Sequence, residues 1–351
     1  MEDYNEGIGR IIRKYSGTSG LVSIYEWGSI SKPGISDIDI VLVFKDAYKP
    51  LPFLKRSFYL AGSKVSYLAR HPFIFIGEKS LQDINYINPD VELKLLHGRK
   101  CSINRLGNKE SSHVKISVMN DLIIRHYPRD FLPQVAGRVI NVRDTLLRLN
   151  SLTYTISTME GLTGKKNRPW DRAARQIKWL RQNWFRAKDF GLLTKLNEEA
   201  SDITIEVVGA FRDFLINKKI ADVVSGKKVV YKGAKNRSLF IGNWDKETAL
   251  AAMMENGRYS VLPLELAPQL AEYSKHNGEI SSYIRKNIFG NIVYRIKNKG
   301  IIKKRIGILN DQASLAKRLK HSDFPAFFDY GYRAKSGINN MVLNLVDKIR
   351  Y

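Results

Sequence analysis

The chain has 351 residues, of which 58 are Lys or Arg and 34 are Asp or Glu, giving a formal net charge of +24 at pH 7. A hydrophobic content of 44% with 11 prolines excludes an intrinsically disordered protein, and the length predicts two or three domains. The single cysteine, Cys101, excludes an intrachain disulfide, and no apolar stretch is long enough to predict a transmembrane helix. We therefore expect a protein of the reducing cytoplasm. The sequence leaves its oligomeric state open.

The basic excess is concentrated after residue 100. Residues 1–100 carry 14 basic and 11 acidic side chains, whereas the remainder carries 44 and 23. This balance predicts a polyanionic partner, with nucleic acid ahead of an anionic membrane surface, although a Lys-rich genome composition gives basic chains as well.

The N-terminal part predicts a mixed sheet with helices packed on it. Residues 4–16 place apolar side chains at helical spacing, and the apolar run from Leu21 to Trp27 predicts a first strand. Further strands are predicted over residues 37–44, 72–76 and 91–96, and residues 51–69 predict a helix that crosses the sheet.

From about residue 118 the pattern changes to long helical periods. Helices are predicted over residues 139–159, 167–186, 192–217 and 264–288, and a basic hairpin over 227–241. The hairpin either grips a nucleic acid or protects an edge strand, and the aromatic cluster at 324–332 is either core or a stacking platform. The predicted class is α+β, with a catalytic domain (1–117), a helical domain (118–225) and a basic α+β region (226–351).

The most informative stretch joins the first two strands. Gly28-Ser29 ends the first strand, and Asp37 and Asp39 stand two apart at the head of the second. On an extended chain these two carboxylates point to one side, and they repel unless a cation compensates them. Mg²⁺ takes such oxygen ligands together with phosphates, and a phosphate can approach Gly28, which has no Cβ. The Ser29 hydroxyl can donate a hydrogen bond to the same phosphate.

A hydrophobic residue, Gly-Ser, a short spacer and then Asp-hydrophobic-Asp resembles the DNA-polymerase-β-like nucleotidyltransferase superfamily, over about the first hundred residues. The resemblance implies that Asp37 and Asp39 bind Mg²⁺, with two ions in the reaction, and that Gly28 and Ser29 bind a nucleoside triphosphate such as ATP. It further implies transfer of a nucleoside monophosphate to an acceptor hydroxyl, with release of pyrophosphate. Lys32 either adds charge beside the pyrophosphate or is a surface lysine.

The superfamily usually carries a third carboxylate on a later strand. Glu92 is the candidate for this third catalytic and metal-binding acid, with Asp90 as its substitute, because both stand at the start of the strand predicted over 91–96. A solvated acid opposite Lys94 is the alternative. If the strand at 73–76 is the equivalent one, the third acid is missing.

The helix predicted over 167–186 carries a basic face. Its cations stand opposite an apolar stripe of Trp, Ile and Leu, and no acid lies between Asp171 and Asp189. This face predicts phosphate contacts, with a solvated surface as the alternative. The proposed nucleic-acid-binding residues are Arg172, Arg175, Lys178 and Arg186.

Other chemistries lack their motifs. No Gly-rich loop has P-loop spacing, no His or Cys pattern fits zinc, and no Gly-x-Ser-x-Gly elbow occurs. The resemblance thus has no rival motif, and it implies a nucleotidyltransferase. The basic charge of the chain predicts that its acceptor is a nucleic acid, with RNA as the first choice. A small-molecule or protein acceptor, or a non-catalytic nucleic-acid-binding protein of this fold, are the alternatives.

Overall fold

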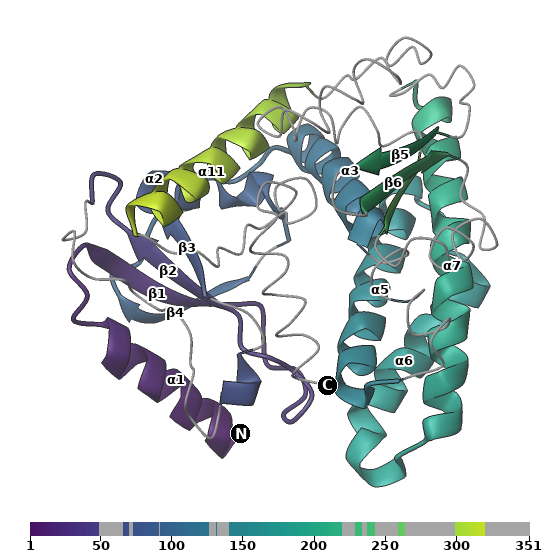
Figure 1. The fold of residues 1–351 in the computed structure, drawn as a ribbon, viewed down its shortest axis with the longest axis horizontal. Coiled ribbons are helices and arrows are strands. Elements are labelled where there is room, and N and C mark those ends of the chain that lie inside the picture. Colours follow the sequence, from purple (N-terminus) through teal and green to yellow (C-terminus); the bar gives the residue numbers. More distant parts are fainter. Residues whose placement is uncertain are drawn as a thin grey trace. The chain divides into compact units, whose positions relative to one another are not determined.

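The computed structural model describes residues 1–48, 66–69, 73–90, 92–125, 131, 140–219, 229–233, 237–242, 259–263 and 299–319. It has a mixed sheet near the N-terminus followed by a mostly helical region, which confirms the predicted α+β class (Figure 1). The chain divides into two compact units. The first contains residues 1–114 together with the described residues from Gly300 onward, and the second contains the described residues from 115 to 299. The region predicted as 226–351 is thus shared between the units.

The first unit is built on a four-stranded sheet, counted over the described residues, in the order β3-β2-β1-β4. Its strands are β1 (Leu21–Trp27), β2 (Ile40–Phe44), β3 (Ile74–Gly77) and β4 (Leu93–Gly98). β1 is antiparallel to β2 and β4, whereas β3 is parallel to β2. β2 is buried at every position, because it lies inside the sheet with both faces covered. All four predicted strands are present, but β2 begins at Ile40, after the two aspartates that were expected at its head, and β3 and β4 each begin two residues later than predicted.

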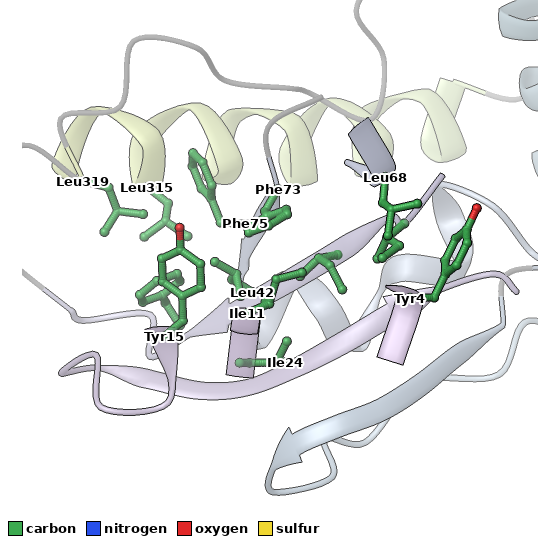
Figure 2. Packing of buried hydrophobic residues seen from close by; sticks show 13 residues of the cluster. Tyr4, Ile11, Tyr15, Ile24, Leu42, Leu68, Phe73, Phe75, Leu315 and Leu319 are labelled. Atoms are coloured by element: carbon green, nitrogen blue, oxygen red, sulfur yellow. The ribbon is translucent and has the colours of Figure 1, made fainter. Parts of the chain in front are cut away.

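Helix α1 (Glu2–Tyr15) packs its apolar stripe on the sheet, as the sequence predicts. Tyr4, Ile11 and Tyr15 are buried in one cluster with Ile24 of β1 and Leu42 of β2 (Figure 2). The apolar residues recur at helical spacing on α1 and at every second position on the strands, so one face of each element is removed from water.

Helix α11 (Lys299–Arg318), which follows the second unit in sequence, also belongs to this core. Leu315 lies in the same hydrophobic cluster as Phe75 (Figure 2), and Gln312 Nε2 donates to the Phe75 carbonyl at 3.3 Å. Arg305 is fully buried, and its guanidinium donates to the carbonyls of Tyr86 and Ile87 at 2.5 and 2.9 Å. Satisfying the buried guanidinium in this way fixes α11 beside the 3₁₀ turn η2 (Ile84–Tyr86), which follows α2 (Glu78–Gln82).

The second unit contains α5 (Val142–Thr163), α6 (Arg168–Ala187) and α7 (Phe190–Asn217), which pack against one another. All three predicted helices are confirmed. Each begins at a polar N-cap whose side chain accepts a hydrogen bond from the backbone amide three residues on, and these caps are Asn141, Asn167 and Asp189. Gly164 ends α5 with a φ of 69°, which favours glycine at this position.

The predicted hairpin is present as antiparallel strands β5 (Val229–Gly233) and β6 (Arg237–Gly242), with Gly233 opposite Arg237. A third strand, β7 (Tyr259–Pro263), pairs parallel to β6 and was not predicted. Helix α3 (Asn108–Arg125) starts earlier than the change of pattern near residue 118 suggested. Of the helix predicted over 51–69 only residues 66–69 are described, with a 3₁₀ turn η1 (Ser66–Leu68). The predictions for 264–288 and 324–332 lie outside the described residues.

Within the described ranges, every helix falls short of the length and apolar character that crossing a bilayer requires.

Candidate active site

The elbow between β1 and β2 begins at Gly28, whose φ is +75°. Residues with a side chain rarely adopt this conformation, so the turn itself favours glycine. A Cβ placed on Gly28 would meet no atom within 4 Å, which means that the space in front of its backbone is open. Ser29 follows on the exposed surface. The two residues therefore present an accessible backbone and an exposed hydroxyl, and their binding of a phosphate stays a prediction.

A tyrosine of α1 forms two hydrogen bonds with the backbone of the elbow. The Tyr4 hydroxyl accepts a hydrogen bond from Gly34 N at 2.9 Å and donates one to the Ser36 carbonyl at 2.6 Å. The Ser36 hydroxyl in turn accepts from Lys32 N at 3.0 Å, across the turn at Pro33 and Gly34. Tyr4 is only 2% exposed, so these bonds form in a buried setting and fix the chain that leads into Asp37. The sequence gives Tyr4 no distinction beyond a place in the first predicted helix.

Asp37 and Asp39 alternate with buried residues as predicted. Ile38 is 1% and Ile40 0% exposed, whereas both aspartates are half-buried. Because alternate residues of an extended chain point to opposite sides, the two carboxylates share the side turned away from the Ile38 and Ile40 packing. Trp27 N donates to the Asp39 carbonyl at 2.9 Å, so Asp39 lies directly beside the end of β1 where Gly28 begins the elbow.

Glu92 lies at the same end of the sheet, on the other side of β1. Gly28 N donates to the Glu92 carbonyl at 2.8 Å, so the backbones of Asp39 and Glu92 flank β1. The register nevertheless separates their side chains. Trp27 pairs with Leu93, and β1–β2 pairing continued by one residue sets Trp27 opposite Asp39.

Paired residues of neighbouring strands point to the same face, which places the Asp39 side chain on the face of Leu93. Glu92 is the neighbour of Leu93, so alternation directs it to the opposite face. In agreement with this, no three His, Cys, Asp or Glu side chains of the described residues are grouped so that they could hold a metal ion. Asp90, the substitute, is exposed in the loop before β4. The third carboxylate stays a prediction.

Sequence reasoning missed Glu26, a carboxylate inside β1. It is 5% exposed and pairs with Ile40 on one side and Lys94 on the other, where Lys94 Nζ lies 3.8 Å from Glu26 Oε2. The only signal in the sequence is an acid within an otherwise apolar run. Glu26 lies on the sheet face opposite to the Asp39 side chain. Lys32, the other predicted residue of the site, is half-buried in the turn between β1 and β2.

The predicted basic face is present on α6 in the second unit. Trp170, Ile177 and Leu180 are buried, whereas the four proposed nucleic-acid-binding residues, Arg172, Arg175, Lys178 and Arg186, are exposed. Arg172 is within 4.0 Å of Glu199 of α7, so part of its charge is compensated. The other three form no ion pair that the described residues provide.

Comparison with known proteins gives no match, whether to a protein-family model, to a curated protein or to a solved structure. The resemblance to nucleotidyltransferases therefore rests on the motif residues of the sequence alone and stays a prediction.

Proposed function

We propose that the first unit is a metal-dependent nucleotidyltransferase that moves a nucleoside monophosphate from a nucleoside triphosphate to the hydroxyl of an RNA acceptor, releasing pyrophosphate. One observation supports this above the others. The open backbone of Gly28 and the half-buried pair of Asp37 and Asp39 meet at one end of the sheet, joined by the hydrogen bond from Trp27 N to the Asp39 carbonyl. Phosphate approach and carboxylate ligands are thus available side by side.

The residues present fit Mg²⁺. Asp37 and Asp39 are two oxygen donors on one side of an extended segment, and Mg²⁺ is commonly held by one or two carboxylates together with substrate phosphates and water. When bound, the metal supplies neutralisation of the phosphate charge and stabilisation of the departing oxygen. Superfamily members use two ions and a third acid, and the register directs Glu92 to the other face, so the proposal depends on the aspartate pair.

The chain's own groups have distinct tasks in this proposal. Gly28 leaves room for the outer phosphates, and the Ser29 hydroxyl donates a hydrogen bond to them. Tyr4 holds the turn so that the aspartates are positioned before substrate binds, and such positioning is a large part of phosphoryl-transfer catalysis. Lys32 stands in the same turn and adds positive charge near the leaving pyrophosphate.

RNA is the proposed acceptor because of the charge of the chain. The net charge of +24 is concentrated after residue 100, and α6 presents exposed cations with no interleaved acid. A small-molecule or protein acceptor would not require such a surface. A second candidate is a nucleic-acid-binding protein of this fold without transfer activity, which is favoured by one observation: the described residues hold no cluster of three acids.

The test uses the full chain, Mg²⁺ and each of the four α-labelled ribonucleoside triphosphates, with and without protein-free cellular RNA. Label that enters RNA, and that fails to do so with the Asp39→Asn variant, supports the proposal. Label that enters a small-molecule or protein fraction instead contradicts the RNA acceptor. Nucleotide binding without transfer to any fraction contradicts the enzyme and favours the second candidate.

A further inference from the structure

Two large aromatic side chains are exposed on α6. Trp179 is 48% and Phe185 54% exposed, although the apolar stripe of the same helix is buried elsewhere. Exposing aromatic surface to water is unfavourable, so two such side chains on one helix face call for an explanation. The sequence pattern did not reveal them, because the other tryptophans of this helix belong to its buried stripe.

The aromatics lie within the basic face. Residues three, four or seven apart share one side of a helix. Trp179 stands four residues after Arg175 and seven before Arg186, and Phe185 stands seven after Lys178. All five are exposed, and no acid occurs between Asp171 and Asp189. We name these five residues, Arg175, Lys178, Trp179, Phe185 and Arg186, the α6 stripe.

Cations interleaved with exposed aromatic rings match one ligand well. The rings stack on bases, which are accessible in a single strand and covered by their neighbours in a duplex, while Arg and Lys contact the phosphates. We propose that the α6 stripe binds single-stranded nucleic acid, with Trp179 and Phe185 stacking on bases. The inference that the α6 stripe binds single-stranded nucleic acid does not depend on the proposed function. The further step, that it holds the acceptor strand during catalysis, rests on the proposed function.

A membrane surface is the competing ligand for a basic helix with aromatic residues. A helix that lies in a membrane interface inserts a continuous apolar face. On α6 that face is buried against the neighbouring helices, with Trp170 at 5%, Ile177 at 1% and Leu180 at 0% exposure. Only two separate rings remain among the cations, which favours stacking over insertion.

The experiment measures binding of a fluorescein-labelled 20-nucleotide single-stranded RNA, and of the same sequence as a duplex, to the full chain. We expect a clear preference for the single strand, and a loss of about tenfold in its affinity on Trp179→Ala or Phe185→Ala, because each base stack contributes about 1–3 kcal/mol. Trp179→Phe should restore most of the affinity. Arg175→Gln should instead lower the salt dependence of binding, by about 0.7 in the slope of log affinity against log salt.

Tyr154→Ala is the matched control, because Tyr154 of α5 is 59% exposed and lies outside the α6 stripe. Its substitution should leave RNA affinity unchanged. Equal affinity for duplex and single strand, an equal effect of Tyr154→Ala and Trp179→Ala, or binding to phosphatidylserine vesicles but not to RNA would each overturn the inference.

Failure of the two proposals can be told apart. If the wild-type chain transfers no nucleotide but both it and the Asp39→Asn variant bind single-stranded RNA, the proposed enzyme activity is contradicted and the α6 stripe is supported. If the chain transfers nucleotide to RNA but its affinity for single-stranded RNA is unaffected by substitution of Trp179 and Phe185, the α6 stripe is contradicted and the enzyme activity is supported.

Discussion

The Tyr4 hydroxyl, buried in the first turn of α1, donates a 2.6 Å hydrogen bond to the main-chain carbonyl of Ser36, the residue before Asp37. Tyr4→Phe removes this bond and leaves the Gly34 amide, its other partner, unpaired. We expect a loss of about 1–3 kcal/mol in the free energy of unfolding and a fall in kcat with little change in KM, because the aspartates are less well positioned.

Ile11→Val in the same helix provides the control for Tyr4→Phe. Ile11 is fully buried, so the smaller side chain should cost about 0.5–1.5 kcal/mol in stability and leave kcat unchanged. A parallel fall of kcat in both variants would assign Tyr4 a purely structural role.

Asp37→Asn and Asp39→Asn should each abolish nucleotidyl transfer, because each removes a charged oxygen ligand from the proposed metal site. Their thermal stability should be unchanged or higher, since the repulsion between two nearby carboxylates is relieved. Asp3→Asn removes an equal charge from an exposed position of α1 and should leave transfer intact. Transfer within a few-fold of wild type in either variant would contradict the metal assignment.

Glu92→Gln should leave transfer within a few-fold of wild type, because the strand register directs this side chain to the sheet face opposite to Asp39. The measurement is kcat of Glu92→Gln relative to wild type, with the nucleoside triphosphate that the wild type transfers fastest. A loss as large as that of Asp39→Asn would instead establish Glu92 as the third acid, and such a loss in Asp90→Asn would move that role to Asp90.

Gly28→Ala should raise the KM for the nucleoside triphosphate, because a methyl group would stand where the phosphate approaches. The positive φ of Gly28 adds about 1–2 kcal/mol of backbone strain. Gly164→Ala carries a similar strain, since Gly164 has a φ of 69° and open space around it, but it lies at the end of α5. An equal rise in KM over wild type in both variants would show that backbone strain, and not the lost space at Gly28, is responsible. A wild-type KM in Gly28→Ala would contradict the phosphate contact.

Tyr86 links two charged groups of the first unit. Its hydroxyl donates to Glu110 Oε1 at 2.9 Å, which lowers the pKa of Glu110, and accepts from Lys304 Nζ at 2.6 Å, which raises the pKa of Lys304. The Glu110 contribution to stability is present above its ordinary pKa of 4.5 and is lost as the pH falls through the lower folded-state pKa. The Lys304 contribution is lost as the pH rises past its raised pKa.

Tyr86→Phe should therefore lower stability at neutral pH, and the difference from wild type should shrink in acid, as followed by urea unfolding at pH 7 and at about pH 3. Tyr154→Phe, at an exposed site on α5, should show no such pH dependence. A Tyr86→Phe deficit that stays constant across this range would contradict the contribution of Glu110.

Local patterns were sufficient to predict the four strands of the first unit and the helices α1, α5, α6 and α7, whereas β7 and α11 were not predicted. Leu21–Trp27 forms a strand because it is mostly apolar and ends at a glycine. Asn167 starts α6 because its side chain caps the first turn. The face of Glu92 could not be predicted in the same way. It depends on which strand β4 joins and on the register that sets Leu93 opposite Trp27, and neither is encoded near residue 92.

The same limit applies to contacts between residues far apart in sequence. Nothing around Tyr4 indicates that its hydroxyl reaches Gly34 and Ser36, because those bonds depend on how α1 packs on the finished sheet. Likewise, the exposure of Trp179 follows from which side of α6 is covered by its neighbours, and a tryptophan in an amphipathic helix is ordinarily buried.

The position of α11 has a consequence for synthesis of the chain on the ribosome. Arg305 and its carbonyl partner Tyr86 are 219 residues apart, so at roughly 5–20 residues per second the sheet waits about 10–40 seconds for this helix to be translated. During that interval the nascent sheet lacks Leu315 and the guanidinium that satisfies the Tyr86 and Ile87 carbonyls. The helices of the second unit emerge in the meantime. The core of the first unit should therefore be completed only after α11 has been translated.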